Sequence, residues 1–226
     1  MSQPTVWFER PPVPGTEDAV AARAAIVVAT GDDQWEGLDE AEGIIAGAYK
    51  YTAEVIAAAP KLLAIGRTGI GVDSVDLEAA TAHGVAVMNV PDGPTTATAE
   101  HAVALIMTVA KDIKPSEQRL IEQSGDYYPR HEAIELDGKT LGLLGIGRIA
   151  RQVAGVGTSL GMRVLSYDPY VGVSRFPPGV EKVDSLEEIL SRSDVVSVHV
   201  PHTPETHHLI NAETLATMRT GGAAKC

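Results

Sequence analysis

The stretch LGLLGIGRIA, residues 141–150, decides how the second half of this 226-residue chain is expected to fold. Its apolar start is typical of a buried β-strand, and its end suits the first turn of an α-helix. Between them lies the spacing Gly145-x-Gly147-x-x-Ala150, whose glycines permit a tight turn and a close approach to the backbone. Alone the spacing is weak evidence, but between a strand and a helix it predicts a phosphate-binding turn.

A carboxylate further along the chain extends this motif. The next apolar run ends in Tyr167-Asp168-Pro169, and Asp168 follows Gly145 by 23 positions (168 − 145), near the usual separation of about 20. A carboxylate at the end of a second strand accepts hydrogen bonds from ribose hydroxyls and repels a 2′-phosphate. The pattern therefore predicts a dinucleotide site that prefers NAD to NADP.

Short apolar runs alternate with helical patterns on both sides of this turn. Such alternation is typical of parallel sheets covered by helices. The expected strands are residues 6–8, 25–28, 43–46, 62–65, 85–88, 140–146, 163–167 and 195–200. The expected helices include residues 51–59, 77–82, 148–160, a segment from the Ser185 capping box to about 193, and 212–218 after Asn211.

The rhythm changes near residue 98. Ala102, Ile106, Val109 and Ile113 recur at helical spacing, so a longer amphipathic helix is expected, with Thr98 as its N-cap. The polar stretch from about 125 to 138 is expected to connect two structural units.

Composition excludes several classes of function. The net charge of −12 and the pI of about 4.9 make nucleic acid and anionic membranes poor partners. The only cysteine is Cys226, and neither a signal peptide nor an apolar run of the roughly 20 residues of a membrane span is evident. We therefore expect a cytoplasmic protein.

Further motifs place this turn in a family context. They are GRTGIGVDSVD at 66–76, NVP at 89–91, AEH at 99–101 and HVP at 199–201. With the glycine turn, they resemble the D-isomer-specific 2-hydroxyacid dehydrogenases, most closely the 3-phosphoglycerate dehydrogenase branch, over residues 43–218 or so. The resemblance implies an α/β fold of two Rossmann/flavodoxin-like domains with parallel sheets. Residues 1–97 would form the substrate (catalytic) domain, and residues 98–226 the first half only of the NAD-binding Rossmann domain.

The resemblance also implies an activity and a set of site residues. The family transfers a hydride between a 2-hydroxy acid and NAD, so the expected partners are a 2-hydroxy or 2-oxo acid, NAD and, in a homodimer, a second copy of the chain. The substrate is expected to contact Arg67, Thr68, Gly69 and Ile70. The cofactor is expected to contact Ile70, Thr98, Gly145, Gly147, Arg148, Ile149, Tyr167, Asp168, Pro169, His199, Val200, Pro201 and Thr206.

Two alternatives concern histidines. His199, His202, His207 and His208 crowd one segment and raise the idea of a metal site, but we favour loop and strand-end histidines and predict no metal. In the family, an Arg, a Glu and a His carry the chemistry and follow the helix that ends here near residue 218. A replacement set made of Glu100, His101 and His199 is the alternative to their absence.

The residues after this helix, RTGGAAKC at 219–226, do not match the family pattern. We therefore assign no catalytic residue and expect a chain truncated before them, with strand 140–146 left unpaired on one side and a fold that is marginally stable or self-associated. The alternatives are a non-catalytic NAD-binding module and a non-functional gene fragment.

Overall fold

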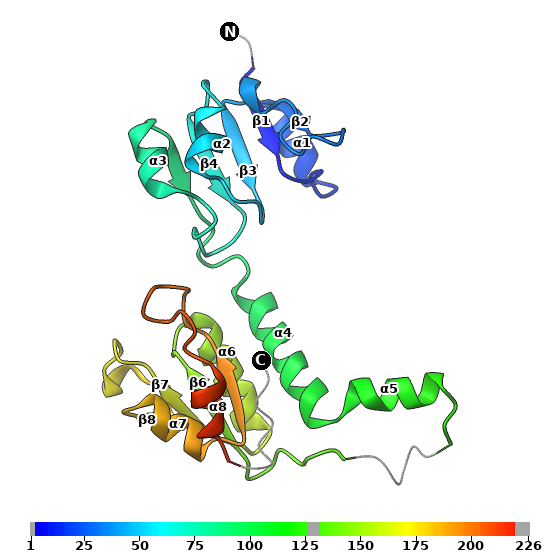
Figure 1. Cartoon of the computed structure of the whole chain (residues 1–226), viewed down its shortest axis with the longest axis vertical. Helices are drawn as coiled ribbons and strands as arrows, with labels where there is room; N and C mark the ends of the chain where they lie inside the picture. Colours follow the sequence, from blue (N-terminus) through cyan, green and yellow to red (C-terminus); the bar gives the residue numbers. More distant parts are fainter. Residues whose placement is uncertain (1–2, 126–131, 220–226) are drawn as a thin grey trace. The chain divides into compact units, whose positions relative to one another are not determined.

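The computed structural model describes residues 3–125 and 132–219 of the chain (Figure 1). Contacts divide it into two compact units, residues 1–94 (unit 1) and 95–226 (unit 2). The division of function between residues 1–97 and 98–226 stays a prediction. The tail at 220–226, Cys226 included, and residues 126–131 lie outside the described residues. The expectation that residues 125–138 connect two units is wrong, because the boundary falls between Pro94 and Thr95 and this stretch belongs to unit 2.

Unit 1 contains a five-stranded parallel sheet. Its strands are β1 (Thr5–Phe8), β2 (Ala25–Val28), β3 (Gly43–Ala46), β4 (Ala64–Arg67) and β5 (Ala86–Met88), in the order β2-β1-β3-β4-β5. Its helices are α1 (Thr16–Ala21), η1 (Leu38–Glu40), α2 (Ala53–Ala57) and α3 (Leu77–Ala82). This strand order is flavodoxin-like, as expected, and it brings the carboxyl ends of all five strands to one edge.

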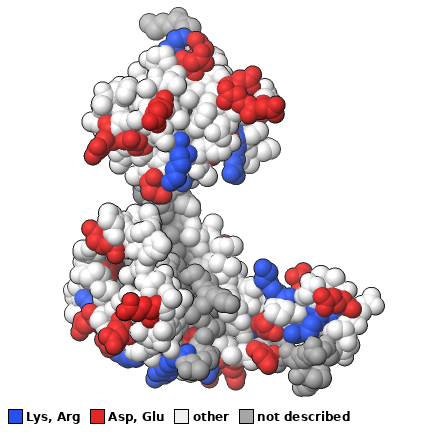
Figure 2. Space-filling view, in the orientation of Figure 1, with Lys and Arg blue, Asp and Glu red and all other residues white. Residues whose placement is uncertain are grey.

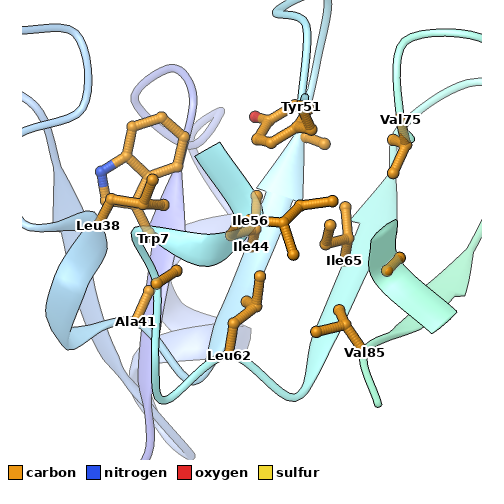
Figure 3. Packing of buried hydrophobic residues seen from close by; sticks show 13 residues of the cluster. Trp7, Leu38, Ala41, Ile44, Tyr51, Ile56, Leu62, Ile65, Val75 and Val85 are labelled. Carbon is orange, nitrogen blue, oxygen red and sulfur yellow. The ribbon is translucent and has the colours of Figure 1, made fainter. Parts of the chain in front are cut away.

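The core of unit 1 is built across the middle of this sheet (Figure 3). Trp7, Ile44 and Ile65 occupy paired positions on β1, β3 and β4, and each is almost completely buried. Trp35 stacks on Trp7 at 5.8 Å between ring centroids and meets Tyr51 edge-on at 5.6 Å. The fluorescence of both tryptophans of the chain therefore reports on the folding of unit 1.

Unit 2 contains a four-stranded parallel sheet. Its strands are β6 (Thr140–Leu144), β7 (Arg163–Tyr167), β8 (Val180–Val183) and β9 (Val195–Val198), in the order β8-β7-β6-β9. Its helices are α4 (Thr95–Ala110), α5 (Ile113–Ile121), α6 (Arg148–Ser159), η2 (Val173–Arg175), α7 (Leu186–Arg192) and α8 (Ala212–Ala216). All five residues of β6 are buried, which explains their continuous apolar character.

The expectation that residues 140–146 would lack a neighbour is wrong. Strand β8 was not predicted, because its segment VEKV carries two charges, so only three strands were expected in this sheet. In the structure β6 pairs with β7 on one side and β9 on the other. The outer position on that side belongs to β9, which pairs only with β6 among the described strands.

The start of α4 is also corrected. The helix begins at Thr95, so Thr98 lies within its first turn and is not the N-cap that the sequence predicted. Thr95 is buried, whereas Thr98 is exposed. The same helix ends at Ala110, and Asp112 with φ of 51° separates it from α5, so Ile113 belongs to a second helix.

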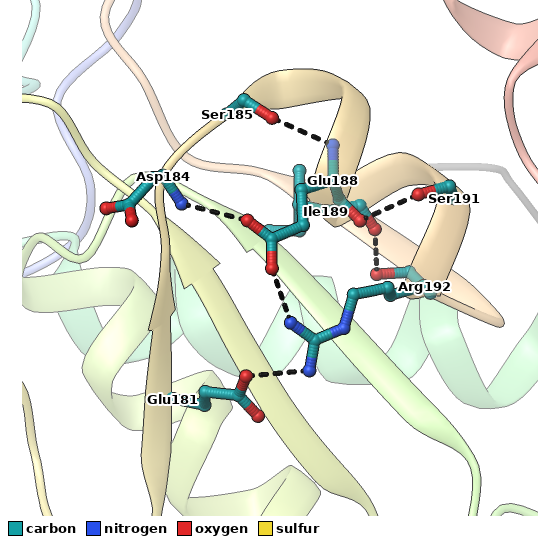
Figure 4. Close-up of polar contacts among 8 residues, drawn as sticks. Glu181, Asp184, Ser185, Glu188, Ile189, Ser191 and Arg192 are labelled. Atoms are coloured by element: carbon teal, nitrogen blue, oxygen red, sulfur yellow. Dashed lines mark hydrogen bonds and ion pairs between the residues drawn. The ribbon is translucent and has the colours of Figure 1, made fainter.

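The start of α7 agrees with half of the predicted capping box: Ser185 is the N-cap, but the Glu188 side chain bonds to the Asp184 N–H and not to that of Ser185 (Figure 4). The Ser185 hydroxyl accepts a hydrogen bond from the Glu188 N–H at 3.0 Å, and Glu188 accepts one from the Asp184 N–H at 3.2 Å. Arg192 then joins Glu188 to Glu181 of β8. The cap and the ion pairs together hold α7 against the strand that the sequence analysis missed.

The surface agrees with the acidic composition. Figure 2 shows Asp and Glu side chains on the visible face of each unit. None of the helices in the described ranges is both long enough and apolar enough to cross a membrane.

Candidate cofactor and substrate sites

A cavity of about 580 Å³ lies at the carboxyl ends of β6, β7 and β9 in unit 2. This is the edge at which ligands bind in open α/β sheets. Nine of the residues predicted to contact the cofactor line it: Gly145, Gly147, Tyr167, Asp168, Pro169, His199, Val200, Pro201 and Thr206. The fold thus brings three separate segments of the predicted site together. We call this space the cofactor cavity.

Gly145 is required by the close approach of the turn to β9. Its φ is +91°, and a Cβ there would lie 3.0 Å from the carbonyl oxygen of His199. Its N–H donates to the carbonyl of Tyr167 at 2.8 Å. A side chain at this position would therefore strain the turn against backbone that cannot move aside.

Gly147 is different, because no described residue around it requires it to be small. A Cβ built on Gly147 meets no atom within 4 Å, and its φ is −71°. Gly147 is the N-cap of α6, whose first turn contains no acidic residue. Open space in front of a helix N-terminus is the arrangement that a pyrophosphate needs, so these residues fit a dinucleotide.

Asp168, directly after β7, is hydrogen-bonded to the glycine turn that follows β6. Its Oδ2 accepts a hydrogen bond from the Ile146 N–H at 3.0 Å, and its Oδ1 accepts one from the Tyr170 N–H at 3.0 Å. Each oxygen keeps further lone-pair capacity, and the half-buried side chain borders the cavity. Asp168 can therefore hold its turn and still accept hydrogen bonds from ribose hydroxyls.

The segment after β9 forms another wall. Burial lowers the pKa of His199, whose Nε2 is buried without a hydrogen-bond partner in the described part of the chain, so the ring is neutral at pH 7. The Thr206 hydroxyl donates to the carbonyl of Pro201 at 2.5 Å and accepts from the Thr203 N–H at 2.8 Å. This loop is therefore organised by its own hydrogen bonds.

Three of the four clustered histidines contact one another within a single loop. His202 Nε2 lies 3.2 Å from His207 Nδ1, and the His207 and His208 rings meet edge-on at 3.9 Å between centroids. Within residues 3–125 and 132–219, no group of three or more His, Cys, Asp or Glu side chains could hold a metal ion.

Four predicted cofactor residues do not line the cavity. Arg148 and Ile149 occupy the first turn of α6, directly after Gly147. Thr98 is exposed on α4, and Ile70 belongs to unit 1. Their cofactor contacts stay predictions.

The predicted substrate residues, Arg67–Ile70, begin at the last residue of β4 in unit 1 and are called the substrate loop. The Thr68 N–H already donates to the Ala46 carbonyl at 3.0 Å. The N–H groups of Gly69 and Ile70 have no acceptor among the residues that the structure describes. The Arg67 guanidinium lies over Gly69, where a Cβ would be 3.0 Å from Nη1. Two N–H groups and one cation are thus available to a carboxylate.

The sequence analysis missed several residues at these edges. Leu144, Tyr170, Thr203, Glu205 and Leu209 also line the cofactor cavity, and all five lie next to or between residues that were predicted. Glu9 was missed in unit 1. The signal was a carboxylate directly after the apolar strand VWF, at the edge where ligands bind.

Glu9 is buried with a network of donors. Burial by itself would raise its pKa, but the N–H groups of Ala48, Tyr49 and Gly47 and the Tyr51 hydroxyl together hold that pKa below its ordinary value. Burial and the Glu9 charge raise the pKa of Tyr51. Glu9 is therefore ionised and Tyr51 protonated at pH 7.

Glu100 and His101 are exposed on α4. Neither lines the cofactor cavity, whereas His199 does, so this cavity does not bring the three residues of the alternative catalytic set together.

Comparison with known proteins agrees with this geometry. Residues 103–223 match the family model described as D-isomer specific 2-hydroxyacid dehydrogenase, NAD binding domain. D-3-phosphoglycerate dehydrogenase from Synechocystis is 40% identical over 207 residues, which cover 89% of this chain and 37% of the relative. The Mycobacterium bovis enzyme of that name is 38% identical over 226 residues, covering 98% and 42%. The chain thus spans about two fifths of the length of these curated relatives.

Solved structures also align with most of this chain. The TT0316 protein from Thermus thermophilus aligns with a TM-score of 0.79 at 33% identity, over 95% of this chain and 70% of that one. D-lactate dehydrogenase from Aquifex aeolicus, complexed with NAD and lactic acid, aligns with a TM-score of 0.80 at 33% identity, over 95% and 66%.

Proposed function

We propose a function from the premise that this chain belongs to the D-isomer-specific 2-hydroxyacid dehydrogenase family. In this proposal the chain binds NAD in the cofactor cavity and a 2-hydroxy or 2-oxo acid at the substrate loop. The observation that carries this proposal is the direct hydrogen bond from Ile146 in the glycine turn to Asp168. It joins the glycine turn and the Asp168 carboxylate at one cavity, which supports the phosphate-binding and ribose-binding roles proposed for them. The reaction class is hydride transfer at a CH–OH carbon, for which NAD supplies the hydride acceptor.

Three features of unit 2 support NAD as the dinucleotide. The first turn of α6 offers N–H groups to the pyrophosphate, and Gly147 leaves space for it. The Asp168 carboxylate accepts hydrogen bonds from the ribose and disfavours a 2′-phosphate. His199 is neutral, so it adds no charge to the adjoining wall.

The substrate loop supports binding of an acid. Gly69 and Ile70 offer two N–H groups to a carboxylate, and Arg67 adds a positive charge next to them. In this proposal residues 1–97 form the substrate domain and residues 98–226 the first half of the cofactor domain. 3-Phosphoglycerate is the first substrate to test, since similar proteins are named D-3-phosphoglycerate dehydrogenase. No acid–base group of this chain is assigned to the chemistry.

The remaining parts of the proposal are a homodimer and a cytoplasmic location. The edge of β9 and the exposed Leu120 and Ile121 of α5, at 61% and 69% exposure, offer apolar surface to a second copy. Light scattering after gel filtration would test the dimer, and a monomeric mass would contradict it.

The decisive experiment is an NADH titration of the purified chain, followed by the emission of NADH itself. We expect saturable binding that weakens in Asp168→Ala, and much weaker binding of NADPH. Glu205→Ala is the matched control, because Glu205 is exposed at the rim of the same cavity. Absence of binding at millimolar NADH would refute the proposal. Oxidation of 3-phosphoglycerate is assayed separately, since turnover distinguishes a dehydrogenase from an NAD-binding module without activity.

A further inference from the structure

A buried carboxylate organises the turn next to the substrate loop. Glu9, directly after β1, is 8% exposed. Its Oε2 accepts hydrogen bonds from the N–H groups of Gly47 and Tyr49 at 2.5 and 3.1 Å, and its Oε1 accepts one from Ala48 at 2.5 Å. The Tyr51 hydroxyl adds a fourth, at 3.0 Å. A buried charge persists only when it is fully hydrogen-bonded, so Glu9 dictates the conformation of this turn.

The same turn is hydrogen-bonded to both ends of the segment 68–76, which contains most of the substrate loop. The carbonyl of Ala46 accepts hydrogen bonds from the Thr68 N–H at 3.0 Å and the Thr68 hydroxyl at 3.1 Å. At the other end, the Tyr51 N–H donates to the Ser74 carbonyl at 2.8 Å, and the Tyr51 carbonyl accepts from the Asp76 N–H at 2.9 Å. Residues 68–76 are therefore fastened at both ends to the turn that Glu9 organises.

The middle of the substrate loop is held only through its carbonyls. The Val90 N–H donates to the Gly69 carbonyl at 3.1 Å, and the Asn89 amide donates to the Ile70 carbonyl at 2.8 Å. The N–H groups of Gly69 and Ile70 point elsewhere, without an acceptor in the described ranges of the chain. Their direction therefore depends on these two contacts and also on where the two ends of the segment are fastened.

Glu9 also removes a competing anion site. Three successive N–H groups at 47–49 would form a concave anion-binding nest, but the Glu9 carboxylate occupies it. Glu9, Gly47 and Thr68 border one cavity of about 370 Å³, whose other walls are mostly apolar. The N–H groups of residues 47–49 are therefore not offered to a ligand carboxylate.

We propose that Glu9 is a positioning residue of the substrate site, which fixes the turn at 46–51 and thereby aims the N–H groups of Gly69 and Ile70. This inference rests on the proposed function, since the role of the substrate loop belongs to it. Glu9 touches neither the substrate nor the cofactor in this scheme and acts entirely through Ala46 and Tyr51.

The test uses the full chain, ¹⁵N-labelled, with pyruvate as the probe. Glu9→Gln keeps the size of the side chain but replaces one acceptor oxygen by an amino group, which faces N–H donors. We expect hydrogen exchange at the Thr68 and Asp76 N–H groups to accelerate about tenfold, the cost of a disrupted buried hydrogen bond. We also expect the pyruvate response of Gly69 and Ile70 to weaken by a similar factor.

Glu36→Gln is the matched control. The Glu36 carboxylate likewise accepts hydrogen bonds from two successive N–H groups, Thr30 and Gly31, but it is exposed and does not contact the turn at 46–51. We expect this variant to leave Thr68, Asp76 and the pyruvate response unchanged.

If Glu9→Gln does not fold, Tyr51→Phe decides, because it removes one donor of four and should affect the same amides less strongly. Unchanged exchange at Thr68 and Asp76, or an equal acceleration across all strands of unit 1, would overturn the inference. If pyruvate shifts neither Gly69 nor Ile70 in the unmodified chain, the proposed substrate role fails. The exchange data then still decide whether Glu9 positions the loop.

Discussion

Two carboxylates occupy comparable places in the two units and differ in what they leave unbound. Glu9 follows the first strand of unit 1 and Asp168 follows the second strand of unit 2, each at the carboxyl edge of a parallel sheet. Both accept hydrogen bonds from backbone N–H groups of a neighbouring turn. Glu9 is buried and holds four donors, whereas Asp168 is half-buried, holds two and faces a cavity of about 580 Å³.

The difference suits Glu9 to a structural role in unit 1 and leaves Asp168 able to take the binding role proposed for it in unit 2. A carboxylate whose lone pairs are used by its own chain stabilises a turn and offers little to a ligand. A carboxylate with remaining capacity beside open space can do both. Changes at Glu9 should therefore alter stability and loop geometry, and changes at Asp168 should alter cofactor affinity.

The largest expected effect is at the turn beside Asp168. Gly145→Ala places a Cβ 3.0 Å from a backbone oxygen at a φ of +91°, so the free energy of unfolding should fall by about 1–3 kcal/mol and NADH binding should be lost with it. Thermal unfolding and NADH titration measure both. Gly155→Ala, at an exposed position within α6 where a Cβ meets no atom within 4 Å, should instead stabilise by about 0.5–1 kcal/mol. Equal behaviour of the two variants would contradict the role given to Gly145.

The next effect tests the structural role of Glu9. Glu9→Gln should lower the free energy of unfolding of unit 1 by about 1–3 kcal/mol at pH 7. The folded-state pKa of Glu9 lies below its ordinary value, so its stabilisation is present above about pH 4 and is lost as the pH falls through the folded pKa.

Urea unfolding followed by tryptophan emission isolates this effect, because Trp7 and Trp35 both lie in unit 1. The difference between the unmodified chain and Glu9→Gln should shrink as the pH is lowered from 6 to 3. A difference that stays constant with pH would exclude the ionised carboxylate as its source.

Asp168→Ala should change NADH affinity more than stability, the reverse of what is expected for Glu9→Gln. Its two hydrogen bonds are at a half-buried position, so we expect little change in stability but NADH affinity lower by about tenfold, near 1.4 kcal/mol. The preference for NADH over NADPH should narrow as well, since the repelling charge is removed. A large loss of stability with unchanged NADH affinity would place Asp168 in the same class as Glu9.

The smallest expected effect is at Thr206. Its hydroxyl is used within the loop after β9, so Thr206→Val should weaken NADH binding by less than the Asp168 change, by about 0.5–1.5 kcal/mol through loosening of that loop. Calorimetric titration of both variants compares them directly. If Thr206→Val had the larger effect, the hydroxyl would have to contact the cofactor itself.

Much of the cofactor site was predictable because its signals are local. The glycine turn, the strand–helix alternation and Asp168 are read from spacing along short segments, and nine of the thirteen predicted contacts line one cavity. The cap of α8 at Asn211 was predicted for the same reason and is confirmed, with hydrogen bonds from the N–H groups of Glu213 and Thr214.

The failures arose where local patterns mislead. The charged segment VEKV hides β8, because a strand at the edge of the sheet keeps only part of its surface buried. Thr98 has the residue type of a cap, but three more residues of helix precede it.

The sequence by itself determined the fold class, the family and the position of the glycine turn, since periodicity and glycine spacing depend on neighbours within a few residues. Only the tertiary structure decided that Glu9 meets Gly47, Ala48 and Tyr49, nearly 40 positions away, with separations of 38, 39 and 40. It also decided that β9 is the strand that pairs with β6 opposite β7. Pairing between distant segments depends on which parallel strands lie side by side, and no local spacing encodes that choice.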